Sequence, residues 1–358
     1  MTTSFHAVLR EQVLDAAARG GTLRPHGSGS KDFLAQALAG TPLDMRGVQG
    51  VIAYEPSELY ITAHAGTRIA DIEALLASHQ QMLAFEPPHF GASATLGGVL
   101  ASGLSGPRRV AAGSLRDFVL GVSLMDGQGR VLRFGGQVMK NVAGFDVSRL
   151  IAGSFGTLGL VLDVTLKVLP VPQAEQTRVL ELDETEALVR LREWGAQPLP
   201  LSASAWHDGR LCVRLSGAQV AIDAAARLIG GEAADGCAAT GYWQSLREHL
   251  QGFFAGDAPL WRVALPPVAP RLPIDGDVLL EWHGMQRWLR SDADADALRH
   301  VVSALGGHAT LFRGGRALDR ELGVFEPLAP EVMAVHRRLK QAFDPSGVFS
   351  PGRLYAEL

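Results

Sequence analysis

Cysteine is scarce in this 358-residue chain, which contains only Cys212 and Cys237. The two lie far apart and no CxxC motif is present, so the chain lacks the ligand spacing of an iron–sulfur cluster or a zinc site. Isolated cysteines are typical of reduced thiols in a cytoplasmic protein. We therefore expect both thiols to be buried and unpaired, and no metal centre built by this chain.

An excess of one charge is also lacking. The chain has 33 Lys and Arg against 37 Asp and Glu, a net charge of -4, with the two signs interspersed. A nucleic-acid surface or a polybasic membrane patch would need a cationic excess. The N-terminus has no signal-peptide pattern, and the uncharged run 87–107 is too rich in glycine, and bounded by proline, for a spanning helix. We expect no nucleic-acid partner and no transmembrane segment.

The familiar nucleotide and hydrolase motifs are missing. No GxxxxGK[ST] is present, and Asp32 occupies the third glycine position of the dinucleotide-binding string that begins at Gly27. HExxH and GxSxG are absent too, so neither a zinc hydrolase nor an esterase is supported. Any phosphate site must therefore be built in another way.

Glycine, by contrast, is abundant, with 41 residues. Between Gly91 and Gly106, twelve of sixteen residues are Gly, Ala, Ser or Thr. Four Gly/Ser loops follow one another: RPHGSGSK, EPPHFGASATLGGVLASGLSG, GSLRDFVLG and GSFGTLG. Short side chains let a phosphate approach backbone N–H groups, and we expect the first loop, Arg24–Lys31, to open a helix whose N-terminus favours an anion. The four loops indicate a phosphate-bearing cofactor; a tightly packed Gly/Ala core segment is the alternative.

Hydrophobic periodicity predicts an α+β chain in three parts: 1–172, 173–322 and 323–358. In the first part it predicts an N-terminal helix ending at Gly20, a helix over 69–78 and a hairpin turning at Asp126-Gly127. In the second it predicts an antiparallel sheet backed by helices, with a hairpin turning at 207–209. A final helix and an extended tail complete the chain. Five tryptophans of the second part fit a docking surface or a core, and the core is expected because aromatic side chains are mostly buried: Trp206, Trp243, Trp261, Trp282 and Trp288.

The order of these segments resembles a known family. The string RPHGSGSK … EPP … ATLGGVLASGLSG … GSLRDFVLGVSLMDGQGRV … KNVAGFDVSRLIAGSFGTLGLVLDVTLKVLP … FDPSGVFSPGRL is similar to the vanillyl-alcohol-oxidase-type, or PCMH-type, FAD-binding fold. Within it, the order most resembles FAD-binding subunits of bacterial glycolate oxidase. The resemblance spans the chain and is strongest over 20–172 and 335–355. It implies two α+β subdomains around an extended FAD, followed by a smaller antiparallel α+β cap domain.

The resemblance also implies a set of cofactor-binding residues. The first loop would cradle the diphosphate, the second would wrap the diphosphate and ribityl chain, and the later segments would lie beside the flavin and adenosine. His26 lies near, but not at, the position where some relatives attach FAD covalently, so we expect non-covalent FAD. Ser350 and Arg353 depart from the family's Asn-Pro-Gly-Lys tail, which leaves the flavin contact of the tail open. The residues implied are Pro25, His26, Gly27, Ser28, Gly29, Ser30, Pro88, Thr95, Leu96, Gly97, Gly98, Ser102, Gly103, Gly113, Asp117, Val119, Gly156, Thr157, Gly159 and Val161.

The expected chemistry is flavin-dependent oxidation of a small 2-hydroxy acid, glycolate to glyoxylate. The substrate carboxylate would favour an arginine, for which Arg262, Arg287 and Arg313 on predicted strands are candidates. His283 and His308 are candidate bases. Because the sequence does not choose among these candidates, no catalytic residue is assigned.

The segment LGGHATLFRGG lacks the metal-binding GHxGDGNxH string of catalytic relatives. The resemblance therefore implies a flavin-bearing subunit that works with a homologous catalytic FAD subunit and an iron–sulfur subunit. Such a complex would be cytoplasmic or would reach the inner membrane through its partners. Two alternatives stay open: a scaffold whose nucleotide is structural, and a stand-alone flavoenzyme such as a reductase that uses a pyridine nucleotide.

Overall fold

The computed structural model describes residues 2–137, 146–315, 321 and 323–358. Its internal contacts divide the chain into two compact units. The first unit comprises Met1–Leu104, Ser114–Pro170 and Pro327–Leu358, and the second comprises Ser105–Gly113 and Val171–Glu326. Residues 105–113, which the sequence analysis assigned to the first domain, thus group with the second unit. Residues 140–145 of the quoted KNVAGFDVSRL string lie outside the described residues.

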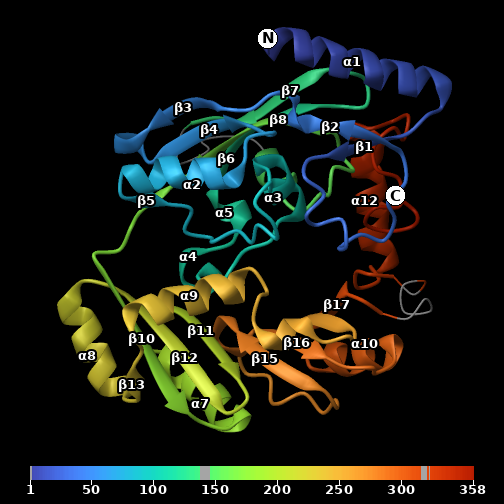
Figure 1. Ribbon diagram of the computed structural model, residues 1–358. Coiled ribbons are helices and arrows are strands. Elements are labelled where there is room, and N and C mark those ends of the chain that lie inside the picture. The colour runs from blue at the N-terminus through green and yellow to red at the C-terminus, as the bar shows by residue number, and fades with distance from the viewer. Residues whose placement is uncertain (1, 138–145, 316–320, 322) are drawn as a thin grey trace. The chain divides into compact units, whose positions relative to one another are not determined.

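A five-stranded antiparallel sheet forms the centre of the first unit (Figure 1). The hairpin predicted at Asp126 is confirmed: the Asp126 carboxylate accepts the amide N–H groups of Gln128 and Arg130 at 2.9 Å each, which fixes the turn. Every residue of β6, an interior strand next to the central strand β8, is buried, so β6 lies between two covered faces. In sheet order, the strands are β3 (Val51–Glu55), β4 (Tyr60–His64), β8 (Leu160–Lys167), β6 (Val119–Met125) and β7 (Val131–Gly135).

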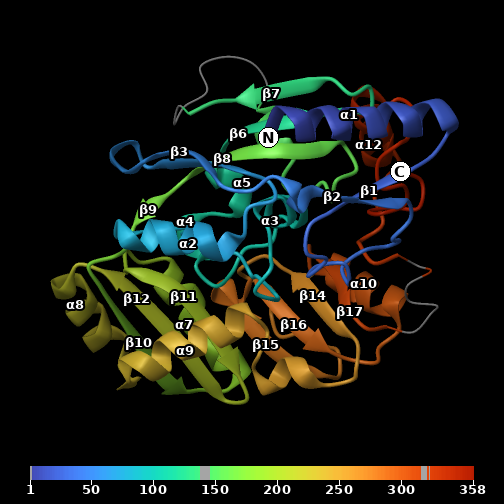
Figure 2. The same cartoon turned by 45° about the horizontal axis from the view of Figure 1, so that its top comes forward.

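Helices cover both faces of this sheet. On one face, Leu9 and Val13 of α1 pack against Met125 and Leu160, and α1 runs along the sheet in Figure 2. The helix predicted over 69–78 is confirmed, and it buries Ile69. The helices of this unit are α1 (Thr2–Arg19), α2 (Ile69–Ser78), α3 (Leu96–Ser102), α5 (Leu115–Phe118), α6 (Val147–Leu150) and α12 (Pro330–Phe343).

Two short strand pairs complete the first unit. A parallel pair joins β1 (Leu23–His26) to β2 (Thr41–Asp44), and an antiparallel pair joins β5 (Gln81–Met82) to β9 (Leu169–Pro170). The isolated bridge Leu23–Phe349 holds the C-terminal tail beside β1. The first Gly/Ser loop therefore leaves a strand that is fixed on both sides.

The loop after β1 does not open a helix, so that expectation is wrong. The structure describes residues 27–40 and assigns turns and bends but no helix there. Asp32 pairs with Arg353 at 2.9 Å and with Arg24 at 3.2 Å. The segment is held by these long-range ion pairs, which the local sequence does not reveal.

The second unit is built on an eight-stranded sheet whose neighbouring strands all pair antiparallel. This confirms the predicted antiparallel sheet and its hairpin at 207–209. In sheet order, the strands are β13 (Glu232–Ala233), β10 (Ala174–Glu181), β12 (Arg210–Gly217), β11 (Leu201–His207), β15 (Asp277–Glu281), β16 (Gln286–Arg290), β14 (Leu260–Ala264) and β17 (His308–Arg313).

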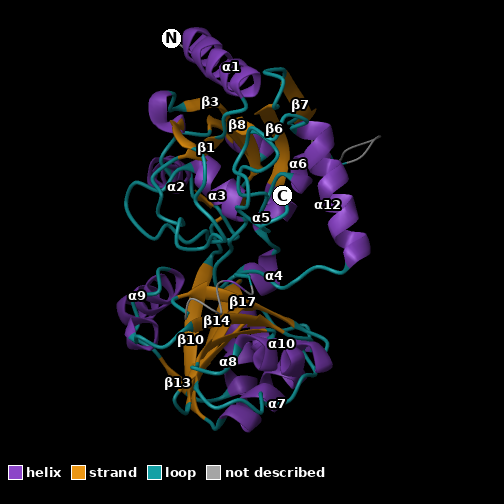
Figure 3. Ribbon diagram, turned by 90° about the vertical axis from the view of Figure 1, so that its right-hand side faces the viewer, coloured by secondary structure: helices purple, strands orange, loops and turns teal. Residues whose placement is uncertain are grey.

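Helices cover the two faces of this sheet unequally. Figure 3 shows α7 (Glu184–Gly195), α8 (Gln219–Ile229) and α10 (Ala295–Ala304) on one side and α9 (Gly236–Arg247) on the other. Two apolar clusters fill the space beneath α7, α8 and α10. The opposite face carries the side chains of Arg262 and Gln286, which are joined by a hydrogen bond of 2.7 Å.

The tryptophans belong to the core of the second unit, which confirms the core interpretation. The five predicted residues and Trp194 are all buried, with exposed fractions of 8% or less. The expectation for cysteine is confirmed for Cys212 but wrong for Cys237, which is exposed. Cys237 lies in the first turn of α9, where its amide N–H donates to the capping Asp235 at 3.0 Å.

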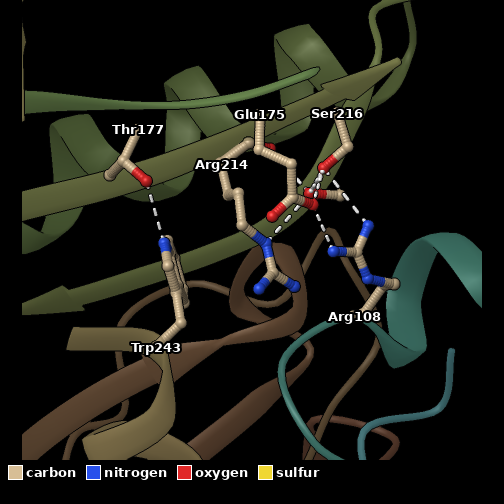
Figure 4. Close-up of polar contacts among 7 residues, drawn as sticks. Arg108, Glu175, Thr177, Arg214, Ser216 and Trp243 are labelled. Atoms are coloured by element: carbon tan, nitrogen blue, oxygen red, sulfur yellow. Dashed lines mark hydrogen bonds and ion pairs between the residues drawn. The ribbon is translucent and has the colours of Figure 1, made fainter. Parts of the chain in front are cut away.

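A polar network attaches the segment Ser105–Gly113 to the sheet of the second unit (Figure 4). Buried Arg108, just before α4 (Arg109–Ala112), donates to Glu175 and to Ser216. Ser216 donates to Glu175 at 2.6 Å, so three side chains share one set of hydrogen bonds. These contacts explain why the segment groups with the second unit.

Candidate cofactor site

A cavity with an empty volume of about 760 Å³, including its solvent-open part, lies within the first unit. Its wall is formed by the end of β1 and the following loop, by α3 and by the turn that leads into β8. Arg353 from the C-terminal tail completes it. Segments far apart in the sequence therefore meet around one space.

The wall of the cavity offers backbone rather than side chain. Within the described part of the chain, the amides of Ser28 and Gly29 have no acceptor. Gly29 has a φ of +72°, a conformation that side chains rarely adopt. A Cβ on Gly98 would meet only the Thr95 hydroxyl, at 3.3 Å, and would otherwise enter the cavity. This wall suits a ligand that accepts hydrogen bonds from backbone N–H groups. A side chain in place of Gly98 would occupy space that such a ligand needs.

Two positively charged side chains, those of Lys31 and Arg353, also line the cavity. Arg353 donates through Nη2 to Asp32, while its Nε and Nη1 are buried and have no partner among the described residues. Burial lowers the pKa of Arg353, although Asp32 acts in the opposite direction. Lys31, also buried, donates to the His89 carbonyl at 3.1 Å. The two guanidinium nitrogens of Arg353 that have no partner among the described residues fit an anionic ligand such as a diphosphate.

Thirteen of the twenty sequence-predicted residues line this cavity. The histidine among them, His26, has a buried Nδ1 without a partner in the described structure. The thirteen are Pro25, His26, Gly27, Ser28, Gly29, Ser30, Thr95, Gly97, Gly98, Ser102, Gly156, Gly159 and Val161.

The other seven lie elsewhere, and each has a local structural setting. Asp117 accepts from the N–H and the hydroxyl of Ser114 and so caps α5. Thr157 donates to the Ser154 carbonyl, and Gly113 belongs to the second unit. Leu96, Val119 and Pro88 are buried, and Gly103 ends α3 with a φ of +65°, beside Gly153.

Sequence reasoning missed seven residues of the wall. Arg353 is the most informative, because the sequence showed it only as a departure from the family tail. Its long-range pairing with Asp32 brings it to the cavity, and no local pattern could have placed it there. The missed residues are Lys31, Asp32, Met45, Ala65, Ala101, Phe155 and Arg353.

The candidate substrate residues lie in the second unit, and the three arginines are on strands as predicted. Arg287 is fully buried and donates to the carbonyls of Ala269, Pro270 and Gly284, so its guanidinium is used in holding loops together. Burial lowers the pKa of His283, and burial followed by the charge of Arg262 lowers the pKa of His308. The lowered pKa favours the neutral imidazole of both histidines.

Neither a metal centre nor a membrane-crossing helix is seen in the described residues. No group of three or more His, Cys, Asp or Glu side chains is placed there to hold a metal ion. Among the helices that the structure describes, none has both the length and the apolar character needed to cross a membrane.

Comparison with known proteins places this cavity in context. Residues 6–135 match a family model described as an FAD binding domain. Alkyldihydroxyacetonephosphate synthase shares the fold, with a TM-score of 0.65 and 15% identity over 95% of this chain and 74% of that one. The glycolate oxidase subunit GlcD of Bacillus subtilis is 31% identical over 37% of this chain and 28% of its own length. Glycolate oxidase subunit GlcE of Escherichia coli is 45% identical over 99% of this chain and 98% of its own.

The match to GlcE runs through both units, and the loops that line the cavity lie within the part that matches the FAD-binding model, apart from the turn into β8 and the tail. The fold is α+β, with PCMH-type architecture, and the cofactor is FAD. The chain belongs to the GlcE family of glycolate oxidase subunits.

Proposed function

We propose that this chain is the FAD-binding subunit of a complex that oxidises glycolate, or a closely related 2-hydroxy acid, to the 2-oxo acid. The observation that carries the proposal is the near full-length similarity to GlcE, together with a cavity whose free amides and two guanidinium nitrogens of Arg353 without a protein acceptor suit a dinucleotide.

The chain's own residues would hold the cofactor non-covalently. The amides of Ser28 and Gly29 would donate to the diphosphate, and Arg353 and Lys31 would balance its charge. Gly98 would leave space for the ligand, where any larger residue would intrude. Acid precipitation should leave the flavin in solution; flavin retained by the protein would show a covalent link, with His26 the first residue to examine.

Bound flavin would supply the redox chemistry, accepting a hydride from the carbinol carbon of the acid. The protein's part is to orient the acid and to hold a neutral group that takes the hydroxyl proton, for which His308 and His283 remain candidates. With two cysteines the chain has too few thiolates for a four-cysteine cluster. We propose that electrons pass to a homologous catalytic FAD subunit and an iron–sulfur subunit, in a cytoplasmic complex attached to the inner membrane through its partners.

The test is to purify the chain alone and together with the proteins that co-purify with it, and to record visible spectra before and after anaerobic glycolate. Flavin bands that bleach only in the assembled complex support the proposal. Bleaching in the isolated chain would show that it oxidises the acid without partner subunits, whereas direct reduction by NADPH would favour a stand-alone reductase. A chain that carries flavin unaffected by any of these would be a scaffold, and a chain without flavin would overturn the cofactor assignment.

A further inference from the structure

Two arginines of the second unit share one indole ring. The guanidinium carbon of Arg109 lies 4.3 Å from the ring centroid of Trp282, and that of Arg262 lies 5.3 Å from it. Trp282 is itself buried, and its indole N–H donates to the Gly106 carbonyl at 3.1 Å. A ring face attracts each cation, but two cations gathered at one ring repel each other.

A hydrogen bond holds the guanidinium of Arg262 only through its Nε. Its Nε donates to Gln286 Oε1 at 2.7 Å, and the amide nitrogen of Gln286 donates to Glu281 at 2.9 Å. In the described structure this is the only hydrogen bond of Arg262, and no carboxylate lies within ion-pair distance of it. Its two terminal amino groups are therefore oriented but have no acceptor.

The register of the sheet shows which face Arg262 occupies. Its neighbours along β14, Trp261 and Val263, pack against the side chains of α10. Side chains alternate along a strand, so Arg262 projects from the opposite face. There it sits beside Trp288 of β16 in the ladder.

Electrostatics agree with an anion-binding role. Burial, and next the charge of Arg109, lower the pKa of Arg262 to about 10, so the group is still a cation at neutral pH. The two arginine charges also contribute to lowering the pKa of His308. Arg262 and Arg109 are half-buried, and two neighbouring cations repel each other unless an anion lies beside them. The charge of Glu281 acts in that direction, raising the pKa of Arg262.

The backbone beneath the ring is strained. Trp282, His283 and Gly284 have φ values of +51°, +58° and +82°, three consecutive left-handed residues of which two carry side chains. Such conformations cost free energy and are concentrated at functional sites. Here the strained turn between β15 and β16 sets the indole against both guanidinium groups.

We propose that Arg262 and Arg109, arranged around Trp282, bind the carboxylate of a small 2-hydroxy or 2-oxo acid. A guanidinium binds a carboxylate or a phosphate through two parallel N–H···O hydrogen bonds, so its paired donors identify an oxoanion site. The choice of a carboxylic acid over phosphate rests on the proposed function, whereas the oxoanion site rests on the geometry of the second unit alone.

The experiment is anaerobic isothermal titration calorimetry of the full chain with glycolate, acetate and inorganic phosphate. Wild type should bind both carboxylates saturably and phosphate more weakly. Arg262→Gln should weaken glycolate binding about tenfold or more, and Arg262→Lys should weaken it less, because the charge is kept but the paired donors are lost. Arg227→Gln, on the exposed side of α8, removes the same charge elsewhere and should bind as wild type.

The outcomes separate this proposal from the preceding one. No carboxylate binding by wild type, or unchanged binding by both Arg262 variants, would overturn the site. Equal binding of phosphate would overturn the choice of a carboxylic acid. Flavin content, measured on the same samples, and glycolate oxidation by the assembled complex report on the proposed function instead. If Arg262→Gln fails to fold by circular dichroism, Arg262→Lys and Arg109→Gln decide the question, since the first retains both cations at the ring and the second retains one.

Discussion

The two units of this chain differ in the groups that they offer to a ligand. The first offers backbone: glycines, free amides and one guanidinium from the tail. The second contains all six tryptophans of the chain and places arginines against them. The contrast follows from chemistry, because a large polyanionic cofactor needs space and N–H groups, whereas a small carboxylate needs a few oriented side chains.

The largest expected effect on flavin binding is at Gly98, in the backbone-lined cavity of the first unit. We expect Gly98→Val to abolish flavin uptake, lowering occupancy at least about tenfold, because the new side chain would fill the cavity. The ratio of flavin to protein absorbance measures this. Gly241→Val on α9, where a Cβ meets nothing within 4 Å, is the matched control. Full flavin occupancy in Gly98→Val would show that the cofactor lies elsewhere.

The aromatic core of the second unit is tested at Trp261. Trp261→Ala should lower the free energy of unfolding by about 3–5 kcal/mol, since it empties a fully buried site between the sheet and α10. Chemical denaturation measures the loss, and Trp261→Phe should lose less. Flavin bound per folded chain should stay the same. A fall in flavin affinity as large as that expected for Gly98→Val would show that flavin binding depends on the second unit as well as on the first.

The next prediction concerns FAD affinity and Arg353, whose guanidinium lies at the wall of the cavity in the first unit. Arg353→Gln should weaken FAD binding about tenfold to a hundredfold, because it removes charged donors that have no protein acceptor. Fluorescence of released flavin on dilution gives the dissociation constant. Arg338→Gln on the exposed side of α12 serves as the control. Equal affinity in the two variants would limit Arg353 to its ion pair with Asp32.

The smallest effect concerns acid stability of the second unit. Burial lowers the pKa of His249 well below its ordinary value, with Arg313, Arg262 and Arg290 acting in the same direction. Below about pH 6.5 the unfolded chain takes up a proton that the folded chain resists, so stability falls as pH falls, by at most about 1.4 kcal/mol per pH unit for this group. His249→Phe should flatten the profile between pH 7 and pH 5, measured by denaturation. A variant profile as steep as that of wild type would contradict this.

Local patterns predicted the elements well. The helix over 69–78 and the hairpin at Asp126-Gly127 follow from apolar spacing and turn chemistry that act within a few residues. The loop after β1 was mistaken for a helix start, because its conformation depends on Asp32 meeting Arg353 from the far end of the chain. Cys237 was expected inside, but its place in the first turn of α9 leaves it exposed.

The sequence by itself determined the α+β class and the Gly/Ser loops, because short-range periodicity and the absence of side chains are written residue by residue. Most of the residues that line the cavity followed from the resemblance of these loops, in their order, to a known family. Only the tertiary structure decided that Arg353 completes that wall, that residues 105–113 join the second unit, and that Arg109 meets Arg262 at Trp282. The physical reason is that buried charges find their partners through space, and the side chains that meet in this way are separated by tens to hundreds of residues along the chain.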